Sequence, residues 1–243
     1  MKKLLLQFLF LPIFGLCQIH NYEDYMPTSK DNNIHHETYY SFSYLNNHLL
    51  SEWTIYFSTR ERIMKKYNNY SRHFVLNPND KIQSAALSDY RNSGYDRGHL
   101  VPAADMNFDS IAFRESYYLT NITPQRHKFN RGIWKKIEYN VRELTKKYDS
   151  LIIITGCVFT DTTYNYPHKV GNVSVPAYYY KVIADIQELR AFCYIVPNDP
   201  KDVKCEDYGE IDEYIYTVDQ LENLTNIDFF YKLPKYQQEL LEK

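Results

Sequence analysis

Four consecutive residues, Asp96-Arg97-Gly98-His99, combine a carboxylate, a guanidinium, a glycine and an imidazole. Histidine titrates near neutral pH, so His99 can take a proton from water. Arginine stays charged and presents a planar fork that fits phosphate oxygens, which makes Arg97 a candidate phosphate contact. Gly98 lets the backbone approach a ligand closely. These residues favour chemistry on a phosphate ester, although a surface turn can collect the same four residue types.

A second block lies further along the chain. It consists of Asn121-Ile122-Thr123-Pro124-Gln125 and Asn130-Arg131-Gly132-Ile133-Trp134-Lys135-Lys136-Ile137-Glu138. With the first block and the spacing between them, it closely resembles the DNA/RNA non-specific endonuclease family, the ββα-metal or His-Me finger nucleases related to endonuclease G. The resemblance extends from the region of Tyr39 to Phe229-Phe230. It implies a ββα-metal active site.

The resemblance also implies a role for each matching residue. His99 would be the general base that deprotonates the attacking water, and Arg97 would contact the phosphate. Asn130 would be the one direct protein ligand of a divalent cation, Mg²⁺ or in its place Mn²⁺. Glu138 would hold metal-bound waters, and Asn121 would help to position the region of His99.

Two positions of the family pattern need separate treatment. Asp96 belongs to the motif and is assigned an orienting rather than a catalytic task. The family also uses an arginine from an earlier strand region near the phosphate, but Leu49-Leu50-Ser51 contains none. That role is vacant or is filled by Arg60, Arg62 or Arg126.

Residue chemistry and helix geometry agree with these roles. Because Mg²⁺ keeps several waters, one asparagine plus water-mediated contacts is sufficient to hold it. Asn130, Trp134 and Glu138 are successive four-residue steps along an expected helix, so they share a broad face. Helix capping is the alternative role of Asn130. Arg126 and Arg131 flank Asn130 and are predicted to bind backbone phosphates, with solvation of a loop as the alternative.

The elements that must position these residues follow from periodicity. Apolar residues recur at three- and four-residue intervals from 130 to 147, which predicts an amphipathic helix. Aromatic and β-branched runs predict strands at 39–44, 52–58 and 151–158 and a hairpin of 173–184 with 189–196. An extended segment at 96–102, a short strand at 117–122 and short helices at 109–116, 218–224 and 233–243 complete the pattern. The fold class is therefore α+β, with a mostly antiparallel central sheet flanked by helices.

The first residues predict a signal peptide over 1–18. Met1-Lys2-Lys3 is a basic start, and the apolar run from Leu4 to Leu16 is too short for a comfortable membrane span. Lipidation of Cys17 is the alternative. Residues 19–243 show no repeat or long linker, so they are expected to form a single domain. The expected location is secreted or periplasmic, without membrane association after cleavage.

The cysteines and the remaining histidines lack metal-binding spacing. Cys157, Cys193 and Cys205 would remain after removal of the leader, in a compartment that permits disulfides. A bond between Cys193 and Cys205 is the expected pairing, although sequence alone cannot fix connectivity. No CxxC spacing indicates a structural zinc site. Surface residues are the interpretation for His35, His36, His127 and His168.

Charge is distributed unevenly along the chain. The formal net charge is −2, but residues 114–147 carry nine Lys/Arg against three Asp/Glu. Residues 198–243 carry five against twelve. The basic part begins just after the Asp96–His99 turn, which favours an anionic substrate at that face.

The combined prediction is a secreted, metal-dependent endonuclease that cleaves DNA and RNA. Little base preference is expected, because a site that engages phosphate and metal reads no base edges. The resemblance implies products with a 5′-phosphate. Two alternatives remain: a phosphodiesterase acting on small phosphoesters, and a non-catalytic nucleic-acid-binding module. A homodimer and an inhibitor protein are left open as partners.

Overall fold

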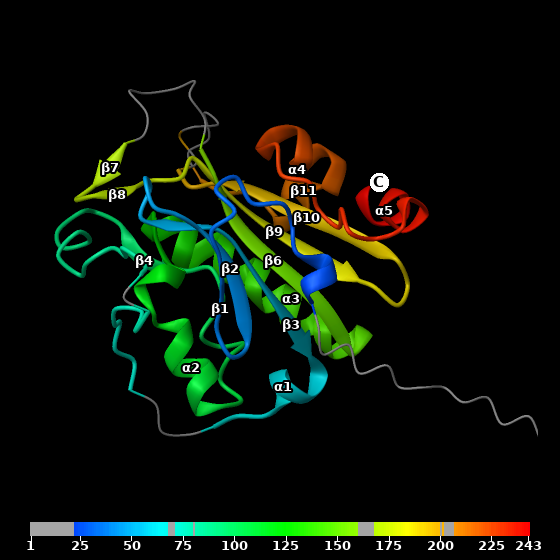
Figure 1. The fold of residues 1–243 in the computed structure, drawn as a ribbon, viewed down its shortest axis with the longest axis horizontal. Helices are drawn as coiled ribbons and strands as arrows, with labels where there is room; N and C mark the ends of the chain where they lie inside the picture. The colour runs from blue at the N-terminus through cyan, green and yellow to red at the C-terminus, as the bar shows by residue number, and fades with distance from the viewer. Residues whose placement is uncertain (1–21, 68–70, 80, 160–167, 200, 202–206) are drawn as a thin grey trace, which may run out of the picture.

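A seven-stranded sheet forms the centre of the computed structural model, which describes residues 22–67, 71–79, 81–159, 168–199, 201 and 207–243. Its strand order is β1-β2-β3-β6-β9-β10-β11, and every neighbouring pair is antiparallel (Figure 1). The strands are β1 (Ile34–His36), β2 (Tyr40–Leu45), β3 (Leu50–Thr59), β6 (Ser150–Val158), β9 (Tyr178–Asp185), β10 (Arg190–Pro197) and β11 (Ile215–Tyr216). The α+β prediction is confirmed.

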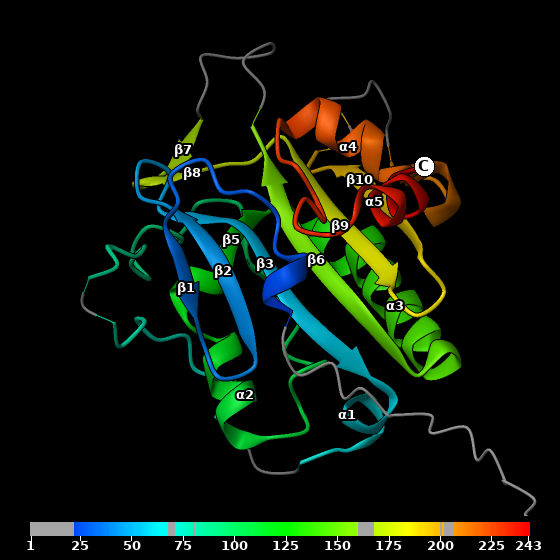
Figure 2. The ribbon, with the colours of Figure 1, turned by 45° about the vertical axis from the view of Figure 1, so that its right-hand side comes forward.

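Helices cover both faces of this sheet (Figure 2). The long helix α3 (Trp134–Tyr148) packs on one face, and the pair α4 (Val218–Thr225) and α5 (Lys235–Glu242) packs on the other. Successive residues of β6 alternate between the two cores, since Ile153 faces α3 while Ile152 and Ile154 face the α4–α5 side. Strands buried on both sides explain why 151–158 is apolar without interruption.

A smaller two-stranded sheet carries the Asp96–His99 motif. Strand β4 (Asp96–His99) pairs antiparallel with β5 (Ile122–Gln125), and His99 lies opposite Ile122. Gly98 is required here, because a Cβ at this position would collide with the buried side chain of Gln125. The chain then leads through a π-helical turn (Phe129–Ile133) directly into α3. This β4–β5–α3 unit is the predicted strand–strand–helix arrangement.

Three local expectations differ from the structure. The expected strand at 117–122 is wrong, because its last residues form a 3-10 turn (Leu119–Asn121) and the strand begins only at Ile122, where β4 offers a pairing partner. Helix α1 (Arg60–Met64), capped by Thr59, lies in a segment for which the sequence analysis predicts no helix or strand. The long helix begins at Trp134 rather than Asn130, because Gly132 has a non-helical backbone.

Short elements complete the fold. Helix α2 (Ser110–Ser116) is capped by Asp109, whose carboxylate accepts from the N–H groups of Ile111 and Ala112. Strands β7 (Lys169–Val170) and β8 (Val173–Ser174) form a separate hairpin. A 3-10 turn at Glu23–Tyr25 begins the described part of the chain, and another at Ile211–Tyr214 precedes β11.

Two further sequence expectations concern the cysteines and the first residues of the chain. Cys193 is a buried free thiol whose sulfur lies 3.5 Å from the carbonyl oxygen of Tyr216 on the neighbouring strand. It therefore takes no part in the expected disulfide with Cys205, which itself lies outside the described residues, as does the predicted signal peptide over 1–18. No described helix has both the length and the apolar character needed to cross a bilayer.

Candidate active site

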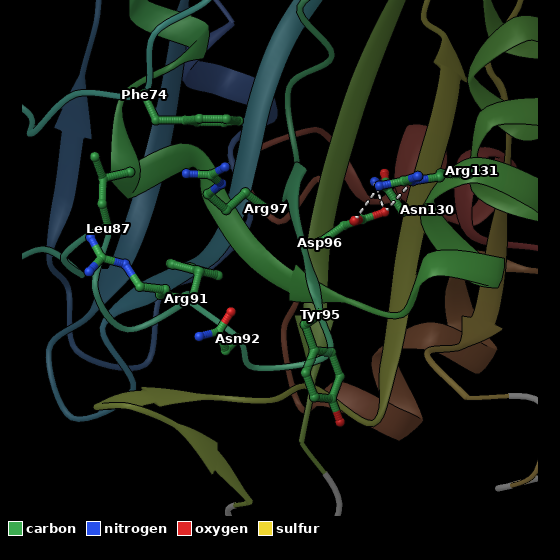
Figure 3. A pocket seen from close by; sticks show the side chains of 10 residues that line it. Phe74, Leu87, Arg91, Asn92, Tyr95, Asp96, Arg97, Asn130 and Arg131 are labelled. Atoms are coloured by element: carbon green, nitrogen blue, oxygen red, sulfur yellow. Dashed lines mark hydrogen bonds and ion pairs between the residues drawn. The ribbon is translucent and has the colours of Figure 1, made fainter.

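A cavity of about 550 Å³ lies between β4 and the turn that precedes α3. Figure 3 shows Arg97 beside the ring of Phe74 on one side of it, and Asp96, Asn130 and Arg131 together on the other. Its full lining is Phe74, Leu87, Tyr90, Arg91, Asn92, Tyr95, Asp96, Arg97, Asn130 and Arg131. Residues predicted from two separate sequence blocks thus share one cavity.

Asp96 is the centre of the polar cluster in this cavity. Its carboxylate accepts a hydrogen bond from Asn130 Nδ2 at 3.0 Å and a two-pronged contact from Arg131 at 2.9 and 2.8 Å. His127 Nδ1 lies 2.6 Å from Asp96 Oδ1. Burial alone would raise the pKa of Asp96, but the hydrogen bonds from Arg131 and Asn130 and the charge of His127 lower it overall. The carboxylate therefore stays ionised, and its task is to orient its neighbours.

The bond to Asp96 leaves the other end of the Asn130 amide free. Asn130 Oδ1 has no hydrogen-bond partner among the described residues, and the side chain lines the cavity. The amide is bonded to Asp96 and not to an N–H at the start of the helix, so capping does not occupy it. An amide oxygen is a suitable ligand for a hard divalent cation. The geometry at Asn130 fits the metal that the family pattern implies.

His99 sits between two aromatic rings. Its imidazole meets Tyr117 edge-on at 4.9 Å between ring centroids and lies 5.6 Å from Phe74. Its Nε2 is buried without a hydrogen-bond partner in the described part of the chain. Burial lowers the pKa of His99 to about 4, so the ring is neutral at pH 7 and able to accept a proton. His99 is separate from the lining of the cavity, although the Phe74 ring approaches both His99 and Arg97.

Asn121 fixes the chain that follows His99. Its Oδ1 accepts from the Val101 N–H at 2.9 Å, and its Nδ2 donates to the carbonyl oxygens of Val101 at 3.0 Å and Ser116 at 2.7 Å. The side chain is fully buried, so it cannot touch a substrate. Asn121 therefore holds the chain after His99 in place, and a part in catalysis through this contact stays a prediction.

Glu138 lies one turn beyond Trp134 on α3, beside a network of buried charges. Burial raises the pKa of its carboxyl group, while the nearby charge of Lys181 opposes this effect. No hydrogen bond to Glu138 is found among the described residues, in contrast to Asp105 nearby, which is bonded to Arg142 at 3.0 Å. Glu138 is absent from the lining of the cavity, so its contact with waters around a cation stays a prediction.

Lys181 is a residue that the sequence analysis missed. It is completely buried on β9, and its ammonium donates to Thr155 Oγ1 at 2.6 Å and lies 4.9 Å from the centre of the Trp134 ring. Its pKa is lowered by burial and raised by the charge of Glu138. The signal was available, because a single lysine interrupts the apolar strand Tyr178–Asp185.

The arginines divide into two groups. Arg97 and Arg91 line the cavity, and the Arg97 guanidinium lies 4.7 Å from the centre of the Phe74 ring without a carboxylate partner in the described part of the chain. Arg126, in contrast, is paired with Asp199 at 3.2 Å and stacked on Tyr95 at 4.2 Å, outside the cavity lining.

The two earlier arginines that could replace the missing one are both engaged elsewhere. Arg60 donates to the carbonyl oxygens of Lys146 and Lys147 at the end of α3. Arg62 packs on the rings of Tyr39 and Phe108. Arg91 lies in a polar stretch that follows a break at residues 77–80, and the sequence analysis assigned no element or role to it. Only its positive charge and its short distance in sequence from Asp96 pointed to the site.

Comparison with known proteins agrees with this geometry. A model of the DNA/RNA non-specific endonuclease family matches residues 18–236. The chain belongs to this family. A solved structure of the EndoG/EndoGI complex, which concerns the mechanism of EndoG inhibition, has the same fold with a TM-score of 0.73 and 26% identity. That match covers 84% of this chain and 88% of the other.

Several nucleases of the family are similar in sequence. The mitochondrial nuclease EXOG of Xenopus laevis is 30% identical over 76% of this chain and 54% of its own length. The mitochondrial nuclease of Saccharomyces cerevisiae is 32% identical over 65% of this chain and 52% of its own. The chain thus spans about half the length of these relatives. Their names place them in mitochondria, which contradicts the expectation of a secreted or periplasmic protein.

Proposed function

We propose that this chain is a metal-dependent endonuclease that hydrolyses phosphodiester bonds in DNA and RNA with little base preference. The observation that carries the proposal is the Asp96–Asn130 hydrogen bond, which presents a free amide oxygen in the cavity that Arg97 also lines. His99, on the same strand as Asp96 and Arg97, supplies a neutral imidazole. Family membership supports the reaction class.

In this proposal each residue performs one task in the hydrolysis. His99 accepts the proton of the attacking water, which is thereby activated as a nucleophile. Arg97 binds the phosphate and balances the charge that grows on its oxygens. Asn130, with Glu138 acting through intervening water, would hold Mg²⁺ or Mn²⁺; when bound, the ion supplies further charge neutralisation at the phosphate and the leaving oxygen. The products would carry a 5′-phosphate.

Arg91 fills the role of the missing arginine. It is exposed and lines the same cavity as Arg97, whereas Arg60, Arg62 and Arg126 are held by other partners. Unlike Arg131, which is paired with Asp96, Arg91 has no carboxylate partner in the described part of the chain and can contact the phosphate that neighbours the scissile one.

The polymer would continue along α3. Beyond the cavity, Lys135 and Lys136 are exposed on this helix. A groove of about 380 Å³ at its other end is lined by four basic residues, Lys65, Lys66, Arg142 and Lys146, together with Ile63, Met64, Ala104, Asn107, Tyr139 and Glu143. Contacts of this kind are made to phosphates and carry no base information, which accounts for cleavage without sequence preference.

The test is digestion of plasmid DNA and of RNA by the wild-type chain and by His99→Ala, with and without EDTA. Loss of the base is expected to reduce cleavage by roughly 10²–10⁴-fold while nucleic-acid binding persists. Chelation is expected to abolish cleavage, and Mg²⁺ or Mn²⁺ to restore it. His36→Ala, which changes an exposed histidine on β1, is the matched control and should cleave normally.

Four results would contradict the proposal. Undiminished nicking by His99→Ala would exclude His99 as the general base. Full activity after rigorous chelation would exclude a required metal ion. Tight binding of nucleic acid in Mg²⁺ without any cleavage would instead favour a binding module. Faster turnover of a bis-aryl phosphate than of either polymer would favour an enzyme for small phosphoesters.

A further inference from the structure

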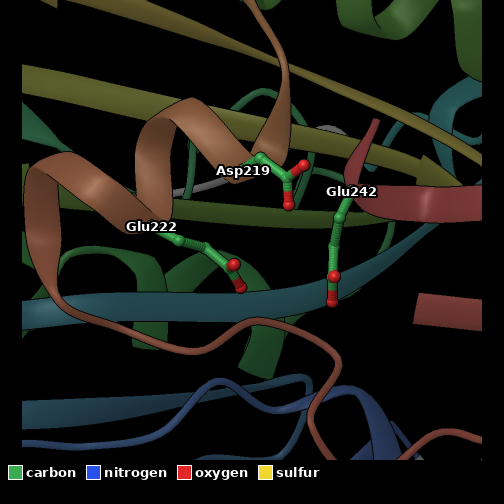
Figure 4. Close-up of side chains that lie close together, drawn as sticks. All are labelled: Asp219, Glu222 and Glu242. Carbon is green, nitrogen blue, oxygen red and sulfur yellow. The ribbon is translucent and has the colours of Figure 1, made fainter. Parts of the chain in front are cut away.

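Three carboxylates converge where α4 meets α5, on the face of the sheet opposite α3 (Figure 4). Asp219 and Glu222 are three residues apart on α4 and therefore share one side of that helix. Glu242, on α5, completes the group. One carboxylate oxygen from each residue lies within 4.8 Å of one from each of the others. No residue proposed for hydrolysis takes part.

The burial of Glu242 is an independent observation. This side chain is only 6% exposed, and its Oε1 is inaccessible to water with no hydrogen-bond partner in the described part of the chain. A buried carboxylate oxygen without a partner is costly, because it has lost water and gained nothing in return. Its position beside two other carboxylates indicates that a cation belongs between them.

The surrounding charges do not supply that cation. Lys235 acts on Glu242 only from a distance, because its ammonium is bonded to Gln238 and makes no ion pair with Glu242. Asp228 and Glu239 add further negative charge. Glu242 also lies in the last turn of α5, where the helix dipole is unfavourable for an anion.

Hydrogen bonding agrees with this description. Glu222 Oε1 accepts from the Phe229 N–H at 2.7 Å, which fixes the direction of its carboxylate. The cluster without a cation is therefore strained by repulsion, and its geometry is held in place.

We propose that Asp219, Glu222 and Glu242 form a binding site for a hard divalent cation, best fitted by Ca²⁺. Carboxylate oxygens are the ligands that such ions prefer. Because Ca²⁺ binds oxygen at about 2.3–2.6 Å, oxygens on opposite sides of the ion are roughly 5 Å apart. Mg²⁺, with bonds of about 2.0–2.1 Å, spans only about 4.2 Å. The three carboxylate oxygens lie within 4.8 Å of one another, a span that Ca²⁺ can bridge without movement of the helices, whereas Mg²⁺ needs separations of about 4.2 Å or less.

The site would fasten the two C-terminal helices to each other. Val218 and Leu221 of α4 and Leu241 of α5 are buried in the core on this side of the sheet. A cation that binds the folded chain and not the unfolded one raises stability in proportion to the logarithm of its concentration above Kd. The role is structural and does not depend on the proposed nuclease activity.

The experiment uses Asn130→Ala as the parent, so that the proposed active-site ligand is absent. After treatment with chelator, the parent is titrated with CaCl₂ by calorimetry and melted with CaCl₂ or MgCl₂. One Ca²⁺ per chain and a Tm increase of roughly 3–6 °C at about tenfold excess over Kd are expected, with a smaller effect of MgCl₂. Adding Glu222→Gln and Glu242→Gln should abolish the heat and the shift. The same two changes should raise the Tm in chelator.

Glu239→Gln, a change of an exposed carboxylate on the same helix, is the matched control and should leave Ca²⁺ binding intact. If the double variant does not fold, Asp219→Asn replaces it and should weaken binding at least tenfold. No heat from CaCl₂ in the parent, or an equal Tm increase in the parent and in the cluster variants, overturns the proposal. Neither result depends on cleavage, so the nuclease proposal stands or fails separately.

Discussion

At the scale of single residues, Asp96 organises the polar side of the cavity. One carboxylate holds Asn130, Arg131 and His127, three side chains from the turn before α3. The motif and the identity of Asn130 were readable from the sequence, because their types and spacing carry the chemistry. The partners of Asp96 were not, since His127 shows no ligand spacing and pairs only once the turn folds back on β4.

The imidazole of His99, whose Nε2 is inaccessible to water, predicts an unusual pH dependence. Its pKa is lowered by burial from 6.5 to about 4, so the ring stays neutral between these values. The acid limb of kcat/KM is therefore expected to fall near pH 4 rather than pH 6.5. The pH–rate profile on a short oligonucleotide measures this, and an acid limb centred at 6.5 would contradict the burial.

The lowered pKa of His99 also affects the free energy of unfolding, which gives a second, independent test of the pKa. A histidine whose folded pKa is depressed contributes fully above pH 6.5 and loses that contribution as the pH falls toward 4. Over this window, the free energy of unfolding should fall by up to ~1.4 kcal/mol per pH unit. Urea unfolding of His99→Ala, which lacks the group, should show a shallower decline with pH than the wild type.

At the scale of elements, the sequence predicted correctly the helices and strands that follow from the spacing of apolar residues. It failed for elements whose position depends on which strand they pair with. The apolar stripe located α3, and the β-branched runs located β3, β6 and the β9–β10 hairpin. The strand β5 was predicted too early, at 117–122, because the aromatic residues there favour strands in general. Only residues 122–125 pair with β4. Lys181 was missed since its partners, Thr155 and Trp134, come from separate elements.

The close packing of β4 on β5 predicts that Gly98→Ala is damaging. A methyl group there would collide with the buried side chain of Gln125, so the strands must separate next to His99. Overpacking of this kind costs typically 1–3 kcal/mol, and activity should fall with it. Chemical denaturation and plasmid nicking measure the two effects.

The rescue variant Gly98→Ala/Gln125→Ala removes the obstructing side chain. It should recover both properties in part, relative to the single change. If Gly98→Ala alone proves as stable and as active as the wild type, the collision is not real.

At the scale of the whole molecule, charge and layering separate two surfaces. The face of α3 carries the cavity, the exposed lysines and the basic groove, whereas the α4–α5 face carries the carboxylate cluster. The sequence showed this polarity as basic and acidic segments. It could not show that the central sheet lies between them, because that depends on the strand order.

The basic groove predicts a measurable salt dependence of binding. In the His99→Ala background, replacing Lys65 and Lys66 by alanine should weaken DNA affinity and reduce the slope of log K against log[salt] by roughly 2, about 0.9 for each lost phosphate contact. Fluorescence anisotropy at several NaCl concentrations measures the slope. Lys232→Ala, whose ammonium is bonded to the Glu23 carbonyl oxygen, is the control and should leave it unchanged. An unaltered slope in the double variant would exclude the groove from the path of the polymer.

The sheet that lies between the two faces has a practical consequence for handling this protein. Because α4 and α5 lie on the side away from α3, a linker or surface tether attached to their exposed residues, such as Tyr236 at 62% exposure, would point away from the cavity. An immobilised form anchored there would leave the entrance open to long polymers in solution.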